Sequence, residues 1–402
     1  MIEARRFSPS RPEPAREDNA HLTKRWLWLM GVLPPALPLL AFVLVRATAQ
    51  PLFWWFGLIF VYGVVAALDL VIGVDRSGCS IASAGAVEND SYYRMLACAV
   101  MPIQYASLIW SAWMLVHGGL GLVDSFGLAV TLGISNGIAI ANAHELGHKP
   151  TFPEIWLAKI VLAPTFFGHF TVEHNGGHHV WAATPEDFSS ARMGESFYTF
   201  YPRTLFGGVS AAWRLETQRL AQRGRSPWSW RNDTLNAWAL SFVLFAGLVA
   251  WLGWSALPWL LLQAFIGLTM LEMINYLQHY GLLREKRADG RYQPCEPRHS
   301  WNSSHLATNI LLYRLPRHSD HHAFPMRRYA ALRHCEEAPQ LPTGYAGMSL
   351  IVLLPWLWRR MVDPALVAFV GGDFSKINVE PSQRENILAR WGENASDGRQ
   401  SL

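Results

Sequence analysis

Six continuous apolar runs dominate the hydrophobic pattern of the chain. Each run is close to the length of about 20 residues that a helix needs to cross the hydrocarbon core of a bilayer. The pattern therefore predicts an all-α polytopic membrane protein, whose six transmembrane helices cover residues 26–45, 51–72, 95–117, 120–142, 236–254 and 256–277.

Basic residues set the expected orientation, because Lys and Arg near transmembrane helices favour the cytoplasmic side. The segment before the first run carries Arg5, Arg6, Arg11, Arg16, Lys24 and Arg25. The connections predicted to face outward are short and hold a single charged residue; they are 46–50, 118–119 and 254–256. Long segments would face the cytoplasm, namely 73–94, 143–235 and 278–402. We therefore expect a protein of the bacterial inner membrane with both termini cytoplasmic.

Composition agrees with a membrane protein and indicates one domain between two polar terminal segments. Hydrophobic residues make up 51% of the chain and charged residues 16%, against about 25% charged residues in soluble domains. One membrane-embedded domain is expected over 24–380, between polar segments, 1–23 and 381–402, that are expected to be disordered. A cleaved secretory signal is a weaker alternative for the first apolar run, since that run exceeds the 7–15 residues typical of a signal.

Charge and cysteine content exclude other kinds of partner and cofactor. The net charge of +4 fits loops near a membrane surface and forms no stripe for nucleic acid. The four cysteines, Cys79, Cys98, Cys295 and Cys335, form no Cys-x-x-Cys pair. An internal iron–sulfur or thioredoxin-like module is therefore not expected. If the chemistry needs electrons, another protein must supply them.

Nine of the fifteen histidines fall into four short blocks, at or beyond the ends of the fourth and sixth runs. They are His144, His148, His174, His178, His179, His279, His318, His321 and His322. Most are three or four residues from another, a spacing that places side chains on one face of a helix. Helical bundles build metal sites in their cores in this way. Since one ion takes three or four imidazoles, nine histidines predict two ions.

The histidine blocks have two other interpretations. A single histidine is often a satisfied polar residue, and His21, His117, His169, His299, His305 and His334 are read so, with His299 and His305 also possible outer contacts of the site. The string His144-Glu-Leu-Gly-His148 also matches the H-E-x-x-H signature of zinc proteases. An intramembrane zinc protease needs one further ligand, and that reading leaves the remaining histidine clusters unexplained.

The longer strings around the histidines resemble the membrane-bound diiron superfamily, in particular the group of alkane 1-monooxygenases and xylene monooxygenases. These strings are His144-Glu-Leu-Gly-His-Lys149, Glu173-His-Asn-Gly-Gly-His-His179, Asn275-Tyr-Leu-Gln-His-Tyr-Gly281 and Arg317-His-Ser-Asp-His-His-Ala323. The resemblance covers about residues 60–380. One departure is Gln278, where glutamate is typical of alkane hydroxylases, and it leaves the exact substrate open.

The resemblance implies two non-haem iron ions bound by the nine histidines, with no catalytic residue beyond the metal ligands. Glu145, Glu173 and Asp320 are expected to orient imidazole N–H groups. The implied reaction is hydroxylation of the terminal methyl of n-alkanes with O2 and electrons from rubredoxin and its reductase. The alternative is benzylic hydroxylation of toluene or xylenes with a ferredoxin-type reductase. In either case hydrocarbon from the surrounding lipid would reach the site through a narrow channel lined by the second, third and sixth transmembrane helices.

Overall fold

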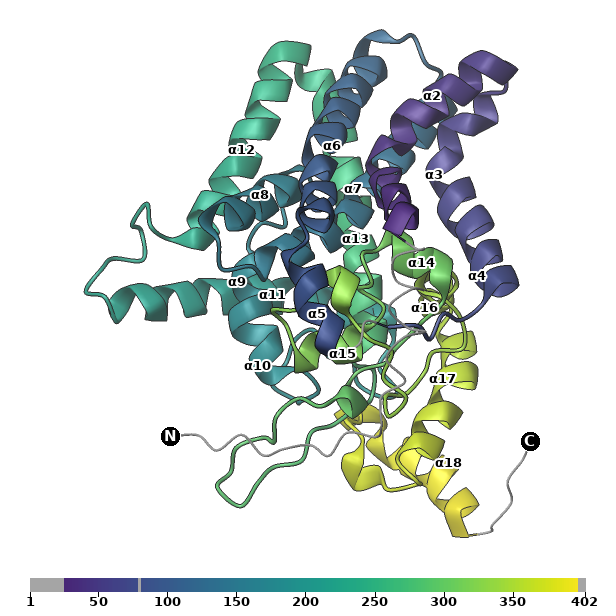
Figure 1. Cartoon of the computed structure of the whole chain (residues 1–402), viewed down its shortest axis with the longest axis vertical. Coiled ribbons are helices and arrows are strands. Elements are labelled where there is room, and N and C mark those ends of the chain that lie inside the picture. The colour runs from purple at the N-terminus through teal and green to yellow at the C-terminus, as the bar shows by residue number, and fades with distance from the viewer. Residues whose placement is uncertain (1–24, 79–80, 397–402) are drawn as a thin grey trace.

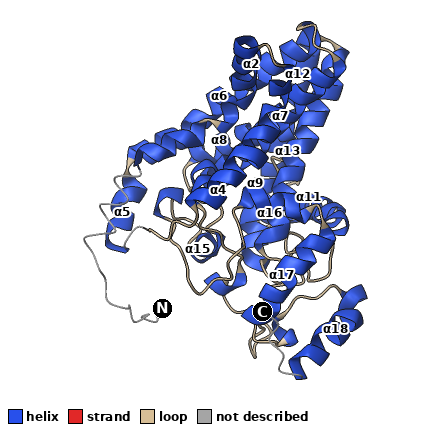
Figure 2. Cartoon of the chain, turned by 90° about the vertical axis from the view of Figure 1, so that its right-hand side faces the viewer, coloured by secondary structure: helices blue, strands red, loops and turns tan. Residues whose placement is uncertain are grey.

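The computed structural model describes residues 25–78 and 81–396, and these residues form helices and loops without a strand (Figures 1 and 2). Within the described residues, six helices are long and apolar enough to cross a membrane, which confirms the predicted all-α class and number of spans. In order along the chain, these spans are Arg25–Thr48 (ending in α2, Leu37–Thr48), Pro51–Ile72 (from α3, Phe56–Leu58, to α4, Ala66–Ile72), Ser91–His117 (α6), Leu122–Gly147 (α7), Asp233–Leu252 (α12) and Trp254–Gln278 (mostly α13, Leu257–Gln278).

Helix α7 is the centre of the bundle, because 89% of its apolar window is buried while no other span exceeds 44%. Gly133 and Gly137, four residues apart, let it approach α13 closely. A Cβ atom on Gly137 would lie 3.1 Å from the Cα atom of Gly267 in α13. Small residues spaced in this way are typical of helix contacts in membranes. The helix also extends beyond its apolar run and carries His144 within it.

Buried amides connect the spans where water is excluded. The side chain of Gln104 in α6 donates to Asn136 Oδ1 in α7 at 3.0 Å, and Asn136 Nδ2 donates to Gln263 Oε1 in α13 at 2.6 Å. Gln263 Nε2 in turn donates to the carbonyl of Pro164 at 2.7 Å. Each amide thereby satisfies a polar group that would otherwise be costly to bury. This network fixes α6, α7 and α13 relative to one another.

A cap of further helices covers one end of the spans, mostly in the lower half of Figure 1, while α8 lies higher, beside α6 and α7. It is built from the three segments predicted to share one side of the membrane, and span one begins beside it, since Tyr313 Oη donates to the Gly31 carbonyl at 3.0 Å. The cap helices are α5 (Ile81–Asn89), α8 (Phe152–Leu162), α9 (Phe170–Glu173), α10 (His179–Trp181), α11 (Phe197–Ala221), α14 (Leu306–Leu311), α15 (His318–Ala323), α16 (Tyr345–Val352), α17 (Pro355–Phe369) and α18 (Arg384–Ser396).

Asp69 at the end of the second span fastens the cap to the bundle. Its fully buried carboxylate accepts from the backbone N–H of Thr308 at 3.0 Å and from the Thr308 hydroxyl, within the first turn of α14. A carboxylate at this position satisfies a backbone donor that the helix leaves unpaired. The bond fixes α14, from which the chain leads to the histidines of α15.

The two terminal segments, both predicted to be disordered, differ in what the structure describes. The N-terminal segment 1–23 lies outside the described residues. The expectation is wrong for the described part of the C-terminal segment, where α18 forms. Ile387 and Trp391 of α18 are partly buried against the core, so this otherwise polar helix has an apolar side that holds it in place.

Candidate metal centre

The first histidine pair lies at the C-terminal end of the central helix, α7. His144 lies in the last turn of α7, and His148 is the residue that caps it. Their rings are 4.8 Å apart between centroids, and both side chains are buried. The four-residue spacing on a helix accounts for this contact. The pair thus stands on the most deeply buried span of the protein.

A π-helical turn divides the second block. Helix α9 is followed by η6 (His174–His178), a turn with i→i+5 bonding, and then by α10. This bonding pattern brings His174 and His179 together, with 3.1 Å between their Nε2 atoms. The rings of His174 and His178 also stack, with centroids 5.1 Å apart, as their four-residue spacing predicted. His178 nevertheless lies with His279, His318 and His322 rather than with His174.

The fourth block is divided in a similar way by α15. His318 and His322, one turn apart, lie together with 2.9 Å between their Nε2 atoms, whereas His321 contacts His179 with 3.1 Å between Nε2 atoms. His279, at the end of α13, completes the nine, 3.1 Å from His318 and 3.2 Å from His322 between Nε2 atoms. All nine predicted histidines therefore meet, although their blocks are far apart in the sequence.

The nine side chains form two groups, each of which could hold a metal ion with ligand atoms within 4.8 Å of one another. We call them the five-histidine group (His144, His148, His174, His179 and His321) and the four-histidine group (His178, His279, His318 and His322). The groups touch, since the rings of His179 and His322 stack with centroids 4.3 Å apart. The structure thus contains two adjacent candidate sites, as nine histidines predicted.

The donor atoms fit metal ions better than they fit one another. Three Nε2 atoms of the four-histidine group converge at 2.9–3.2 Å, and a single proton can bridge only one such pair. Metal–nitrogen bonds of about 2.0–2.1 Å would separate adjacent ligand atoms by about 3 Å. In addition, the buried Nε2 atoms of His144, His148 and His178 have no hydrogen-bond partner. Buried polar atoms without partners are costly, and metal coordination would satisfy them.

Outer contacts set the orientation of two imidazoles. Asp187 Oδ2 lies 2.9 Å from His178 Nδ1 and also accepts from the Ser190 hydroxyl at 2.6 Å. The carbonyl of His299 lies 2.8 Å from His279 Nδ1. Burial alone raises the pKa of Asp187, but the adjacent His178 imidazole and the hydrogen bonds outweigh it and hold the pKa below its usual value. Such contacts fix Nδ1 as the donor and leave Nε2 to face a metal.

Burial also favours the neutral form of several of these imidazoles, which is the form that binds metals. It lowers the pKa of His279 to about 3, and the neighbouring His178 lowers it further. It lowers the pKa of His174 and His321 well below the usual value for the same reason.

The three carboxylates that the sequence indicated have other contacts. Glu145 lies 3.1 Å from Lys149 Nζ and accepts from the backbone N–H of Tyr329 at 3.2 Å. Asp320 is fully buried and pairs with Arg327 and Arg333, the latter at 2.9 Å. Thus two of these carboxylates bind cations of the cap, whereas the carboxylate that contacts an imidazole is Asp187, which the sequence analysis missed.

Glu173 is the third of these carboxylates, and it differs from the other two. It is buried, and its pKa is raised well above the usual value by that burial, with further contributions from the charges of Asp187 and Glu272. It therefore belongs to a buried acidic cluster next to His174.

Two cavities lie between the histidine groups and the interior of the bundle. The smaller one is lined by His144 and His174 of one group, His318 of the other, and Gln278. The larger one has a mainly apolar lining and lies beside it, and Ala141, Leu271 and Leu315 line both. The larger cavity is formed by the second, fourth and sixth spans with α14 and α16. The third span was predicted to line this cavity, and that prediction is wrong. The fourth span, α7, lines it instead, because α7 is the central helix of the bundle.

Comparison with known proteins places this site in a family. The family model described as fatty acid desaturase matches residues 125–351. The chain is 43% identical to alkane 1-monooxygenase 1 of Alcanivorax borkumensis, with 96% of each chain covered. It is 41% identical to alkane 1-monooxygenase of Ectopseudomonas oleovorans, covering 98% of this chain and 96% of the relative. The hydroxylase component of a xylene/toluene monooxygenase of Pseudomonas putida is 30% identical over 61% of this chain and 64% of its own.

These matches include all four histidine blocks and most of the chain on either side of them. An unrelated protease would not share that much of the chain, and the histidines of H-E-x-x-H lie in a group of five. The chain belongs to the fatty acid desaturase family and, within it, to the alkane 1-monooxygenases.

Proposed function

We propose that this protein hydroxylates the terminal methyl of n-alkanes to 1-alkanols at a pair of iron ions held by the nine histidines. The observation that carries the substrate class is the apolar cavity that leads to the histidines through Ala141, Leu271 and Leu315. Alkane 1-monooxygenases match nearly the whole chain at about 40% identity, whereas the aromatic hydroxylase component matches less of it. The cavity indicates a hydrocarbon substrate, and the comparison favours alkanes over toluene or xylenes.

Iron is proposed because the ligands are imidazoles and the reaction is redox. Imidazole suits Zn, Cu, Fe and Ni, and of these zinc has no redox chemistry. When bound, the iron pair supplies the activation of O2. The chain's own residues do the rest. Asp187 and the His299 carbonyl hold protons on Nδ1 of His178 and His279, and the apolar lining admits hydrocarbon and excludes water.

The arrangement of the lining favours attack on the end of a chain. Gly137, Ala141 and His144 follow one face of α7, while Met270, Ile274 and Gln278 follow one face of α13. Since residues three and four apart share a helix face, these two rows run from the interior of the bundle toward the histidines. An unbranched alkane lying between them presents its terminal methyl to the site. Gln278 lies at that end, where it would contact the carbon being oxidised or the new hydroxyl.

We further propose the surroundings in which the reaction occurs. The membrane is the bacterial inner membrane, with the cap and both termini on the cytoplasmic side and residues 24–380 as one catalytic domain. Rubredoxin and its reductase would provide electrons, or a ferredoxin-type reductase if the substrate were an alkyl-arene. Glu145 and Asp320 are already paired with cations of the cap. Two bound cations next to His174 would favour the ionised form of Glu173, which would then offset part of their charge.

Product analysis tests the function directly. In a host that lacks hydrocarbon oxidation, with rubredoxin and its reductase co-expressed and n-octane and p-xylene supplied together, we expect octan-1-ol as the main product. Mainly 4-methylbenzyl alcohol would move the protein to the alkyl-arene hydroxylases. Metal analysis of the purified protein should give about two iron ions per chain; stoichiometric zinc without iron would contradict the proposed centre.

The Asp187→Asn variant tests the outer contact. An amide cannot supply the negative charge that stabilises the Nδ1 proton of His178, so we expect metal affinity or activity to fall about 10- to 100-fold. Metal content under chelator challenge measures this effect separately from turnover. The matched control is Asp363→Asn, a buried aspartate of α17 that accepts from Tyr280 Oη at 2.9 Å. Equal metal loss in both variants would mean that Asp187 acts only through general stability.

A further inference from the structure

The larger cavity is apolar apart from a few hydroxyl groups. The residues that carry them are Tyr62, Thr308, Tyr345 and Ser349. The Thr308 hydroxyl donates to Asp69, and the Ser349 hydroxyl donates to a carbonyl of its own helix at 3.0 Å. The Tyr62 hydroxyl lies beside the Ser349 side chain. Of the four, Tyr345 is the one whose hydroxyl is fully buried without a hydrogen bond of ordinary geometry to any described residue.

Gln278 carries a second buried polar group of this kind, next to the first. Its Nε2 atom also has no hydrogen bond of ordinary geometry within the part of the chain that the structure describes. Burial raises the pKa of Tyr345, and the Gln278 side chain offsets part of that rise. An amide N–H directed toward a hydroxyl oxygen has this effect, because it favours the ionised form. The two side chains therefore face each other, and we call them the polar pair.

The backbone holds the polar pair in place. Tyr345 is the first residue of α16 and follows Gly344, where a Cβ atom would overlap the carboxylate of Asp69. Gln278 is the last residue of α13, and its carbonyl accepts from the backbone N–H of Trp301 at 2.8 Å. The side chains are only 1% and 3% exposed, so they do not reach solvent. Since buried polar groups without partners are costly, a ligand that supplies hydrogen bonds would stabilise this arrangement.

The polar pair lies where the two cavities meet. Tyr345 lines the larger cavity, and Gln278 lines the smaller cavity with the histidines. A few polar groups in a mainly apolar site determine how a ligand is oriented. The fitting ligand has an apolar body for the larger cavity and a terminal oxygen that can both accept and donate. An n-alkane lacks the oxygen, and water lacks the apolar body, whereas a primary alkanol has both.

We infer that the polar pair binds the hydroxyl group of the 1-alkanol, with the alkyl chain of the product in the larger cavity. This inference rests on the proposed function, which makes the alkanol the molecule formed at this place. The Gln278 amide donates to the alkanol oxygen, and the alkanol hydroxyl donates to Tyr345 Oη. The polar pair thus distinguishes product from substrate, because an alkane makes neither hydrogen bond. A bound alkanol then competes with the next alkane for the larger cavity.

Binding to the full protein in nanodiscs tests the polar pair. Headspace gas chromatography gives the free concentration of octan-1-ol or of n-octane, with empty nanodiscs as the blank. Tyr345→Phe removes only the hydroxyl and should lower the affinity for octan-1-ol about three- to tenfold, as expected for one hydrogen bond. Its affinity for n-octane should stay unchanged. Gln278→Leu should show the same difference between the two ligands, and it tests the polar pair independently if Tyr345→Phe does not fold.

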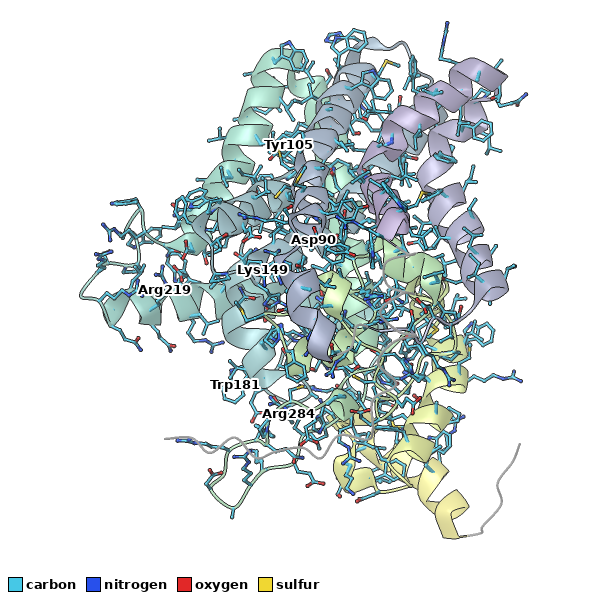
Figure 3. The ribbon with its side chains drawn as sticks, viewed as in Figure 1. Asp90, Tyr105, Lys149, Trp181, Arg219 and Arg284 are labelled. Atoms are coloured by element: carbon cyan, nitrogen blue, oxygen red, sulfur yellow. The ribbon has the colours of Figure 1, made fainter. Side chains whose placement is uncertain are left out.

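Two tyrosines serve as matched controls. Tyr62→Phe removes a hydroxyl from the same cavity, one that lies beside Ser349. Tyr105→Phe removes a hydroxyl that donates to the Ile160 carbonyl at 2.8 Å, among the spans in the upper half of Figure 3. Both variants should bind octan-1-ol as the wild-type protein does. An equal loss of octan-1-ol affinity in either control would overturn the polar pair, as would an equal loss of n-octane affinity in Tyr345→Phe.

The binding measurement needs no turnover, so the polar pair and the proposed function can fail separately. Weaker octan-1-ol binding by Tyr345→Phe supports the polar pair even if the wild-type protein oxidises no alkane, an outcome that would refute only the proposed function. Unchanged octan-1-ol binding in both Tyr345→Phe and Gln278→Leu would mean that water alone occupies this position. That result overturns the polar pair even if the wild-type protein forms octan-1-ol.

Discussion

Replacing His318 with alanine should abolish octan-1-ol formation and remove metal from the protein. His318 is fully buried, and its Nε2 atom lies 3.1 Å from that of His279 and 2.9 Å from that of His322. Its loss takes one of only four ligands from the four-histidine group. Since changing an outer contact alone costs about 10- to 100-fold, loss of a direct ligand should cost more than about 100-fold. Elemental analysis and product yield measure the two effects together.

The control is another buried histidine. His169 lies just before α9, its side chain is 3% exposed, and its Nδ1 atom accepts from Trp238 Nε1 at 3.4 Å. It belongs to neither histidine group. His169→Ala should therefore keep its metal and most of its activity, apart from a modest loss of stability. Full activity of His318→Ala would refute the proposed centre. It would mean that His318 has only a structural role, as the histidines of a scaffold or a transporter would have.

The histidines and the spans could be predicted because they follow simple patterns. An apolar run of about 20 residues has few structures other than a transmembrane helix, and all six runs became spans. Nine closely spaced histidines have few uses other than metal binding. The resemblance of the four blocks then indicated the family to which the chain belongs.

The division of the histidines and the outer contact could not be predicted, for separate reasons. The π-helical turn η6 sends His174 and His179 to one group and His178 to the other, and a single sequence does not distinguish such a turn from an α-helix. The segment Asn175-Gly-Gly177 within it, with poor helix formers, is the signal that could have raised this alternative. Asp187 lies in a loop outside the blocks, so no periodicity marks it as the partner of His178.

The place of the cavity was partly predicted. A channel between spans was expected because the substrate is apolar, and spans two and six do line it. The sequence did not predict the fourth span in the cavity lining, because the apolar segment 120–142 resembles the other five apolar segments in composition. Its burial comes from packing against α6, α8 and α13 on several sides at once, which is a property of the assembled bundle rather than of the segment.

The largest effect on substrate should come from Ala141→Phe. Ala141 lines both cavities and lies three residues before His144 on α7, a rise of about 4.5 Å. A phenyl ring at this position would occupy the passage through which the alkane reaches the histidines. A displacement of about 1 Å from the reactive geometry can cost about 100-fold in rate, so we expect at least this loss of octan-1-ol formation. Iron content should be retained, because the ligands are unchanged.

Met270→Ala tests the opposite end of the same cavity. Met270 lines the larger cavity but not the smaller one, and a Cβ atom on Gly137 would lie 3.0 Å from its sulfur. Removing the side chain should shift the preferred alkanes toward longer chains while leaving the histidines untouched. The control for both variants is Ala250→Phe, on the exposed side of α12. If Ala141→Phe keeps normal turnover of n-octane, or if Ala250→Phe loses as much, hydrocarbon does not reach the histidines through this cavity.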